Sequence, residues 1–556
     1  MNSRQLESPI QPIFKSGLPF VAILVVVLLL WLPMGFTIND RVEGWTIMRY
    51  LSDPSVPIHP QSIGITGRPL LIVPWAIGAW FTPDSFLGTN LVNIVVLWLK
   101  GCALYALVLM FFPRHPAMAF LIAVLWLVYP SDIINLDTRG LGVHWGATLC
   151  LFAIWCYYRW WATKHPLFMG LAWLTLGYCF LFFDPAYPLV AAAPALLPAL
   201  RRGTRSEYLR AGIYWYWVPV VTFIRFFMIL TTGQAGYVGG LLSVDDVGDM
   251  IASVVNAYYM NLVRGWVGIG LSLLDPLLLY LGLGIGIALL VTVVSLRLFR
   301  QSDQRASVPR RKLTRSALVG LTIIPIGFLM YVPTIERWSF WRVYVLPSIG
   351  GALFFGMASL ILTASMRPVR RVIGLILIII LIEIGVLRAY ALSSLNAGFA
   401  YFQRFLLTSL VHEAPSITSN TLIILLNPDA AKFADVYFYG TSVHFEDAIR
   451  YLYQDSTLHF TVCLPDAVPY GKNETCRLES TQVTMEAMGE TIVRTYDQVI
   501  FLTFDPERGL EIAPEIHQAF VHQQDIDSNQ AYDPQKRVLT DHEPSERMRR
   551  LLGIQF

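Results

Sequence analysis

The stretch GLPFVAILVVVLLLWLPMGFTI, from Gly17 to Ile38, decides the class of this protein. It carries no charged side chain, and about 20 apolar residues are enough to cross the hydrocarbon core of a bilayer. Its two prolines, Pro19 and Pro33, lie near its ends, where a helix tolerates proline best. Because no small-residue cleavage site follows Ile38, we expect a retained membrane helix rather than a signal peptide.

Further apolar stretches repeat this pattern along the chain. Only 14% of the 556 residues are charged and the mean hydropathy is +0.54, whereas soluble domains contain about 25% charged residues. We therefore predict an α-helical polytopic membrane protein with about eleven transmembrane helices. The ten candidates after the first cover residues 86–112, 116–131, 141–157, 166–183, 187–200, 211–230, 273–296, 317–332, 343–363 and 372–391.

The basic residues indicate an orientation in the membrane. With the N-terminus placed in the cytoplasm, the inside segments carry 19 Lys and Arg residues and the outside connections carry 7, as the positive-inside rule requires. This count requires that Pro69–Phe81, which contains two prolines and two tryptophans, lies on the outer face as an interfacial helix. The chain is thus expected in the plasma membrane, with its C-terminal part outside the cytoplasm.

The charge balance divides the chain into two parts. Residues 1–392 hold 29 basic and 16 acidic residues, a net charge of +13, whereas residues 393–556 hold 12 and 22, a net charge of −10. We predict a membrane domain over 1–392, a small extracytoplasmic α/β domain over 393–520 and a polar C-terminal tail over 521–556. The total of +3 and the lack of a separate basic domain argue against nucleic-acid binding.

Short patterns within 393–520 support the α/β prediction. The apolar runs 421–426 and 499–503 are typical of strands, and 446–453 is typical of a helix. Cys463 and Cys476 are the only cysteines in this part, and an oxidising compartment would allow them to form a disulfide. The alternative is two free thiols. The other four cysteines lie in predicted helices, where a thiol acts as a small apolar group.

The first outer loop begins with Asp40, directly after the first helix. A carboxylate at the membrane edge could accept a proton from a hydroxyl group, because partial burial raises the pKa of a carboxyl towards working pH. Glu43 lies three residues further on. Without context, a solvated loop acid is the simpler interpretation.

A resemblance supplies the context. The first helix, the acid that follows it, the long outer loop and the segment Gly67–Leu70 resemble the GT-C glycosyltransferase superfamily, and within it the serotype-converting glucosyltransferase II family. The similarity covers roughly residues 17–200 by layout. It implies a sugar donor linked to polyprenyl phosphate, transfer on the outer face, and Asp40 as the general base, with Glu43 as the substitute. No DxD pattern occurs in the loop, so we expect no cofactor, while a divalent metal stays open.

The lipid phosphate that this resemblance implies would need positive charge at the outer surface, because negative charge develops on the leaving group. Arg337 and Arg342 lie in the predicted outer connection 333–342, and an arginine offers a forked donor that suits phosphate. Arg68 and Arg139 are the next candidates. The alternative for these cations is an interfacial anchor whose side chain snorkels to the membrane surface.

Two further groups of polar residues need an explanation. Asp132 and Asp137 lie in the outer connection 132–140, where they could hold sugar hydroxyls or simply cap two helices. Lys100 and Glu383 lie deep within predicted spans, where a lone charge is costly. We therefore predict that Lys100 and Glu383 have a structural role and pair with each other across neighbouring helices.

Together these features favour a membrane glycosyltransferase of the cell envelope. Its catalytic outer loops would be 39–85, 132–140 and 333–342, and its partners a polyprenyl-phosphate-linked sugar, membrane lipid and a glycan, lipid or protein acceptor. The alternatives are a transporter or lipid flippase and a non-catalytic envelope scaffold. The chain has no internal repeat and no Walker, Rossmann or HExxH motif, which argues against an ATP-driven pump or a metalloprotease.

Overall fold

The computed structural model describes residues 17–39, 44–52, 68–231, 246–267, 277–301, 309–339, 342–364, 368–426, 443–463, 475–487, 490–515, 532–539 and 543–553. The chain forms two compact units. The first, called the membrane unit, comprises residues 1–36, 64–74 and 91–395. The second, called the α/β unit, comprises residues 37–63, 75–90 and 396–556.

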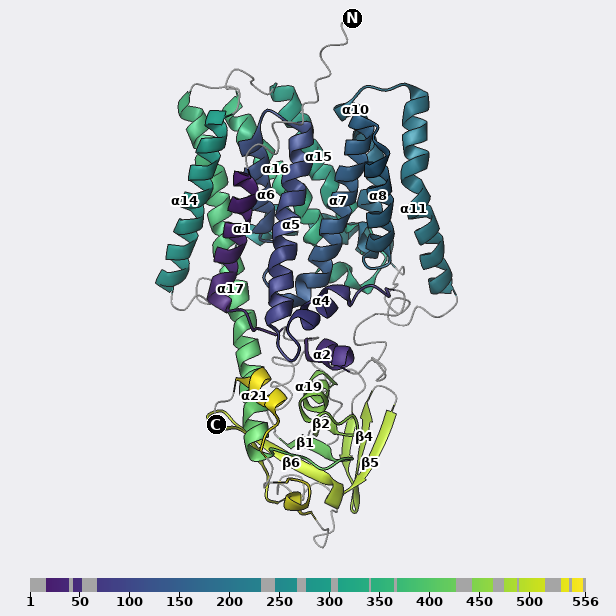
Figure 1. Cartoon of the computed structure of the whole chain (residues 1–556), viewed down its shortest axis with the longest axis vertical. Helices are drawn as coiled ribbons and strands as arrows, with labels where there is room; N and C mark the ends of the chain where they lie inside the picture. The colour runs from purple at the N-terminus through teal and green to yellow at the C-terminus, as the bar shows by residue number, and fades with distance from the viewer. Residues whose placement is uncertain are drawn as a thin grey trace, which may run out of the picture. The chain divides into compact units, whose positions relative to one another are not determined.

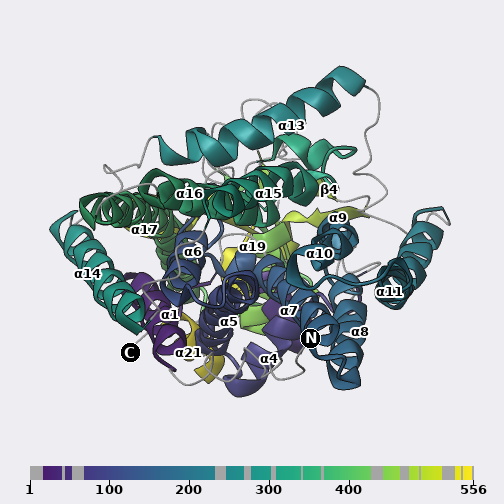
Figure 2. The same ribbon diagram turned by 90° about the horizontal axis from the view of Figure 1, so that it is seen from above.

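Long apolar helices make up most of the membrane unit, and they run alongside one another in Figures 1 and 2. Helical structure lies within each of the eleven ranges that hydropathy predicts. The helices are α1 (Leu18–Trp31), α5 (Leu87–Phe111), α6 (Pro116–Leu127), α7 (Leu141–Thr163), α8 (Pro166–Phe180), α9 (Tyr187–Ala192), α10 (Leu197–Leu200), α11 (Arg205–Thr231), α14 (Leu277–Gln301), α15 (Arg310–Phe328), α16 (Val345–Ala364) and α17 (Pro368–Glu413).

Five stretches of helix among the described residues are long and apolar enough to cross a membrane: Leu87–Phe111, Thr138–Thr163, Arg205–Ile229, Leu277–Arg300 and Val372–Glu413. By length and composition the chain is therefore a multi-pass membrane protein. The predicted count of eleven spans is not confirmed, because the other helices are shorter or carry charges at one end. The helix α10, for example, has only four residues.

Small residues bring α15 and α16 into close contact. A Cβ atom on Gly320 would lie 2.8 Å from the carbonyl oxygen of Gly350, and one on Gly327 would lie 2.8 Å from the backbone carbon of Leu346. Backbones approach this closely in membranes where small residues line the interface, since dispersion contacts and not the hydrophobic effect hold such helices together. Glycine at these positions thus determines the packing of this pair.

The connections between helices gather at two ends of the membrane unit. Residues 68–72, 128–140, 181–186, 329–339 and 342–344 lie together at one end, here called the loop end; the Leu70 N–H, for example, donates to the Leu181 carbonyl over 3.4 Å. At the other end, Lys312 Nζ donates to the Phe111 carbonyl over 2.8 Å.

Among the described residues, the helices α2 (Gly44–Ser52), α13 (Val247–Leu262) and α21 (Glu546–Leu552) were not expected from the sequence. The helices α2 and α21 belong to the α/β unit, and α13 lies along α15 and α16 in the membrane unit (Figure 2). The inner side of α13 packs with Phe328 and Tyr344 in one buried cluster. The predicted interfacial segment 69–81 contains the helix α4 (Val73–Phe81).

The α/β unit contains two sheets (Figure 1). In the first, the strand order is β2 (His459–Cys463), β1 (Leu422–Leu426), β6 (Val499–Asp505) and β7 (Gly509–Ile512). The strand β1 is parallel to both neighbours, with Leu422 opposite His459 on one side and Val499 on the other. All five residues of β1 are buried, as expected for a central parallel strand. The second sheet is antiparallel and consists of β3 (Thr475–Leu478), β4 (Gln482–Ala487) and β5 (Glu490–Thr495).

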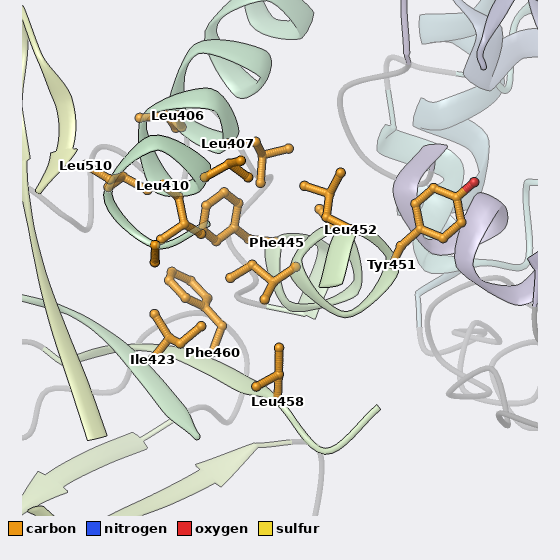
Figure 3. Packing of buried hydrophobic residues seen from close by; sticks show 14 of the residues in the cluster. Leu406, Leu407, Leu410, Ile423, Phe445, Tyr451, Leu452, Leu458, Phe460 and Leu510 are labelled. Carbon is orange, nitrogen blue, oxygen red and sulfur yellow. The ribbon is translucent and has the colours of Figure 1, made fainter. Parts of the chain in front are cut away.

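The core of the α/β unit lies between the end of α17, the first sheet and α19 (Val443–Tyr453). Figure 3 shows Leu406 and Leu410 of α17 facing Phe445 of α19 and Phe460 of β2. The predicted strands at 421–426 and 499–503 and the predicted helix at 446–453 are all present. From the segment expected as a polar tail, four side chains are buried in this same core: Val538 and, from α21 (Glu546–Leu552), Met548, Leu551 and Leu552.

A buried carboxylate joins α19 to β2. The Glu446 Oε1 lies 2.7 Å from Arg450 Nη1, and its Oε2 accepts the Phe460 N–H over 2.9 Å. Burial opposes ionisation of Glu446, but the hydrogen bond from His459 and the charge of Arg450 outweigh it, so that its pKa lies below the ordinary value. Glu446 is therefore held ionised inside the unit.

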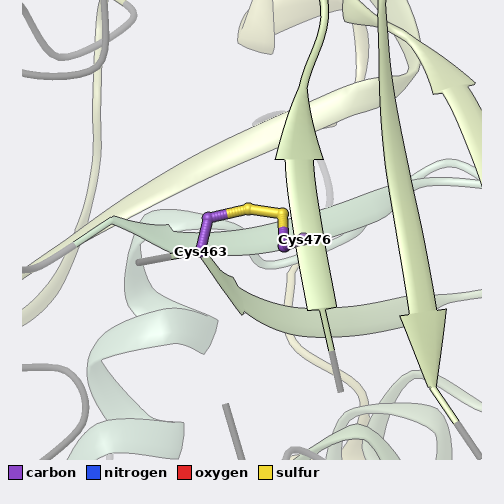
Figure 4. Close-up of a disulfide and its surroundings, with 2 residues drawn as sticks. All are labelled: Cys463 and Cys476. Carbon is purple, nitrogen blue, oxygen red and sulfur yellow. A yellow bond between two sulfur atoms is a disulfide. The ribbon is translucent and has the colours of Figure 1, made fainter. Parts of the chain in front are cut away.

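Cys463 and Cys476 form a disulfide that links β2 to β3 and hence the two sheets (Figure 4). Their Cα atoms are 5.1 Å apart, within the usual range for a disulfide. The other four cysteines are buried and free.

Candidate functional site

Asp40 and Glu43, the predicted catalytic acids, lie outside the described residues. Their roles stay predictions that come from the sequence alone. The other predicted site residues are all described, and four of those in the membrane unit form two groups. Lys100 and Asp132 belong to one buried cluster, and Arg68 and Arg342 lie near Tyr331 at the loop end.

Lys100 lies in a fully buried polar cluster. Its Nζ is 2.7 Å from Asp132 Oδ2, 3.1 Å from Asn135 Oδ1 and 3.3 Å from His144 Nδ1. The side chains of Lys100, Asp132 and His144 have no solvent-accessible surface, and the ammonium also lies 4.7 Å from the centre of the Trp126 ring. The charge of Lys100 is thus neutralised within the loop end, and Asp132 is a buried counter-ion.

The predicted pairing of Lys100 with Glu383 is wrong. Lys100 forms its ion pair with Asp132, because the connection after α6 folds back against α5 and brings Asp132 next to the lysine side chain. Glu383 packs against α14, where glycine leaves room for it: a Cβ on Gly284 would clash with its Oε1. The Glu383 Oε2 has no hydrogen-bond partner among the described residues.

The second group joins three connections that are far apart in the sequence. Arg68 Nη2 is 2.6 Å from Asp184 Oδ1, and Arg342 Nη2 is 3.8 Å from Glu336 Oε1. All four charged side chains act electrostatically on the buried hydroxyl of Tyr331. Two of the predicted phosphate-binding arginines therefore lie in the same part of the loop end, each beside a carboxylate.

Both arginines keep part of their side chains accessible: 19% for Arg68 and 31% for Arg342. The pair of Arg68 and Asp184 is largely buried, whereas Arg342 and Glu336 are more exposed and lie further apart. A phosphate would have to compete with these carboxylates for the guanidinium groups. The pairing of Asp184 with Arg68 depends on the contact between residues 70 and 181, which no local pattern in the sequence reveals.

Arg337 differs from its neighbour Arg342. Its side chain is only 7% accessible and lies 3.9 Å from Asp249 at the start of α13, while its Nη1 donates to the Val332 carbonyl over 3.4 Å. These contacts attach α13 to the connection 329–344. The geometry fits an anchoring cation better than one that meets a substrate.

Asp137 caps a helix. Its Oδ1 accepts the backbone N–H of Arg139 over 3.0 Å at the start of the short helix Thr138–Gly140, which leads into α7. Its carbonyl accepts from Asn93 over 3.2 Å. Asp137 therefore acts as a helix cap, which was the alternative to sugar binding. Arg139 lies in the short helix that Asp137 caps.

Two further arginines occur at the loop end that sequence reasoning did not select. Arg388 donates from Nε to the Pro130 carbonyl over 3.1 Å, and the charge of Arg264 acts on both Arg388 and the Tyr344 hydroxyl. Arg388 lies at the predicted outer end of the span 372–391. A cation at that end of a span is the feature of the sequence that could have identified it.

No group of three or more His, Cys, Asp or Glu side chains among the described residues is arranged to hold a metal ion. The candidate site of the membrane unit consists of Arg68 and Arg342, which lie near Tyr331 at the loop end. Such guanidinium groups can bind an anion and can stabilise negative charge that develops on it.

No protein-family model matches the chain, and no curated protein matches it. Among solved structures, the chain is similar to ArnT from Cupriavidus metallidurans bound to undecaprenyl phosphate, at 12% identity over 80% of this chain and 85% of that one, with a TM-score of 0.37. It is also similar to the apo state of the same protein, at 12% identity over 73% and 81%, with a TM-score of 0.29. Likenesses this weak carry no argument about function, so the function is argued from the residues.

Proposed function

We propose that this protein is a membrane glycosyltransferase. It moves a sugar from a polyprenyl-phosphate-linked donor to an acceptor in the cell envelope, on the extracytoplasmic face. The proposal combines the GT-C resemblance of the sequence with the chemistry available at the loop end of the membrane unit.

The observation that carries the proposal is that Arg68, paired with Asp184, and Arg342, paired with Glu336, both lie close enough to the Tyr331 hydroxyl to act on it electrostatically. These arginines come from connections that lie more than 270 residues apart, and both sit at the end of the unit opposite to the basic residues around Lys312. A phosphate group at a membrane surface is the ligand that two accessible guanidinium groups suit best.

In the proposed reaction, the acceptor hydroxyl loses its proton to the carboxylate of Asp40, and its oxygen forms a bond to the anomeric carbon of the sugar. The bond between that carbon and the phosphate oxygen breaks, and its electron pair leaves with the polyprenyl phosphate. Arg68 and Arg342 would stabilise the charge that grows on this leaving group. Glu43 is the substitute for Asp40 in the same role.

Sugar transfer by the purified protein in lipid, with a panel of polyprenyl-phosphate sugars, tests this proposal. We compare the wild type with Asp40→Asn and Arg342→Gln, and use Arg508→Gln as the matched control, because Arg508 is an exposed arginine of the α/β unit. Removal of one charge-stabilising donor costs about 10²–10³ in kcat. We expect losses of this order in the first two variants and none in the control.

Other outcomes would separate the alternatives. Tight binding of a donor without turnover would favour a transporter or flippase, and a wild type that neither binds nor consumes any donor would favour a scaffold. Equal activity of the wild type and Asp40→Asn would keep the enzyme and move the general base to Glu43. Asp132 is less suited to that role, since it is buried against Lys100.

A further inference from the structure

Two connections of the membrane unit lie next to helices that are long enough to cross a membrane. One is the turn at residues 164–165 between α7 and α8, and the other is the segment 201–204 between α10 and α11. The turn follows the apolar stretch Thr138–Thr163, which starts at the loop end, and the segment precedes the apolar stretch Arg205–Ile229. The turn is therefore at a membrane surface, at the end of the unit opposite to the loop end.

A buried tryptophan at the end of α7 joins the two connections. Trp161 has no accessible surface, and its Nε1 donates to the Arg201 carbonyl over 3.4 Å. Tyr208 of α11 stacks on the Trp161 ring, with 5.3 Å between the ring centroids. The Gly203 N–H donates to the Tyr208 hydroxyl over 2.9 Å, and a Cβ atom on Gly203 would lie 3.0 Å from the tryptophan ring. The backbone of the second connection is thus fixed against the end of α7.

Two cations contact this tryptophan. The Lys164 Nζ is 3.7 Å from the centroid of the Trp161 ring, and the guanidinium carbon of Arg201 is 6.0 Å from it. Aromatic rings attract cations at such distances. Burial lowers the pKa of Lys164, and the positive charge of Arg201 lowers it further. The ring therefore brings two like charges, one from each connection, close enough to repel each other.

Positive charge is in excess around these two cations. Residues 158–165 and 201–210 have a net charge of +5, from six basic residues and one acidic residue: Arg159, Lys164, Arg201, Arg202, Arg205, Arg210 and Glu207. The carboxylate of Glu207 accepts the Thr204 N–H over 2.8 Å, and it also lies 3.5 Å from Arg201 Nη2. The one acid of these ranges is therefore occupied as a helix cap and by one arginine. Among the residues that the structure describes, no carboxylate forms an ion pair with Lys164.

The surface beside these cations is apolar. Leu209 and Ile213 follow Arg205 at steps of four residues on α11, so they lie near the same side of the helix. They are 66% and 61% exposed, and Leu167 at the start of α8 is 59% exposed. A soluble phosphate compound would need only the cations. A phospholipid offers a phosphate for the cations and acyl chains for the apolar side chains, so it matches both parts of this surface.

We propose that Lys164, Arg201 and the adjoining faces of α8 and α11 form a binding site for an anionic phospholipid. The lipid phosphate lies against the two cations, and the acyl chains lie along Leu209 and Ile213. Basic residues next to membrane-spanning helices bind anionic headgroups in this way, and Trp161 is the kind of aromatic residue that is enriched at the membrane surface. The site lies in the leaflet away from the loop end, so it is separate from the arginines proposed for the donor and does not depend on the proposed function.

The test is native mass spectrometry of the full-length protein in detergent with phosphatidylglycerol, and with zwitterionic phosphatidylcholine as the reference. A basic residue near an anionic lipid contributes about fivefold to the affinity. We expect Lys164→Gln and Arg201→Gln each to weaken phosphatidylglycerol binding about fivefold and phosphatidylcholine binding less than about twofold. Both side chains are exposed, so circular dichroism should show unchanged folding.

The matched control is Arg311→Gln. Arg311 is an exposed arginine in the first turn of α15, beside Lys312 and hence at the same end of the membrane unit. Its replacement removes the same charge without touching the connections at Trp161, and we expect the affinity for phosphatidylglycerol to stay within about twofold. The soluble headgroup glycerophosphoglycerol, added at the same concentration as the lipid, should not displace it.

Four results would overturn the proposal. Equal affinity of the wild type for the two lipids would mean that negative charge is not recognised. Unchanged affinity in Lys164→Gln and Arg201→Gln would place the lipid elsewhere. An equal loss in Arg311→Gln would mean that the charge of the whole end attracts lipid without a defined site. Displacement by glycerophosphoglycerol would mean that the cations bind soluble phosphate compounds and that the acyl chains contribute nothing.

Discussion

The buried pair of Lys100 and Asp132 allows a quantitative prediction. Replacement of Lys100 by Met keeps the length of the side chain but leaves the carboxylate of Asp132 without its counter-ion at a site where neither side chain reaches solvent. Removal of one partner of a buried ion pair costs about 3–5 kcal/mol, because the remaining charge stays desolvated. We expect Lys100→Met to lower the free energy of unfolding by that amount.

A double-mutant cycle assigns the effect to the pair. Asp132→Asn removes the other charge, and the double variant Lys100→Met/Asp132→Asn removes both, so its loss should fall short of the sum of the single losses by up to about 3 kcal/mol. Unfolding is followed by circular dichroism in lipid–detergent micelles with increasing denaturing detergent. Glu383→Gln is the control, because Glu383 is not among the contacts of Lys100.

The reasoning would be refuted by strictly additive losses, or by a loss below about 1 kcal/mol in Lys100→Met, which is the level of an exposed pair. A charge exchange gives a further check on the partner. Lys100→Glu combined with Asp132→Lys should fold better than Lys100→Glu alone, whereas Lys100→Glu combined with Glu383→Lys should bring no recovery.

Three further predictions concern stability. The pKa of Glu446 is lowered in the folded state, so its ionised form contributes to the free energy of unfolding. This contribution is fully present above the ordinary carboxyl pKa of about 4.3 and is lost as pH falls through the lower folded value. When unfolding is measured from pH 7 to pH 3, Glu446→Gln should lack this pH-dependent component. Reduction of Cys463–Cys476, which closes a short loop, should destabilise the α/β unit by about 3 kcal/mol in a melt with and without reductant. Gly320→Val should prevent close packing against Gly350 and reduce the yield of folded protein, and Gly282→Val, in open space, should have little effect on that yield.

The membrane helices could be predicted because hydropathy is a local property. Each stretch from Gly17–Ile38 onward is apolar with few charges, and no knowledge of neighbours is needed to see it. The same holds for the strands of the α/β unit, since a run such as Leu422–Leu426 is buried on both faces and is apolar throughout.

Short amphipathic elements escaped prediction because their apolar side chains are few and separated by polar ones. The helix α2 has only nine residues, and its buried positions include Thr46 as well as Trp45. In α21, Met548, Leu551 and Leu552 follow helical spacing, but they lie among arginines and glutamates that make the segment look solvated. The polar partners that complete such elements come from distant parts of the chain.

The sequence by itself thus determined that this chain is a multi-pass membrane protein with an acidic α/β part, because burial in lipid or in a sheet imposes a composition on each segment separately. Only the tertiary structure decided which polar groups meet. From the sequence, either Asp132 or Glu383 could have paired with Lys100. The fold of the connection after α6 places Asp132, and not Glu383, next to the lysine. The attachment of Thr37–Asn39 and α2 to the α/β unit was equally invisible, since hydrogen bonds between residues hundreds of positions apart leave no periodic trace in either segment.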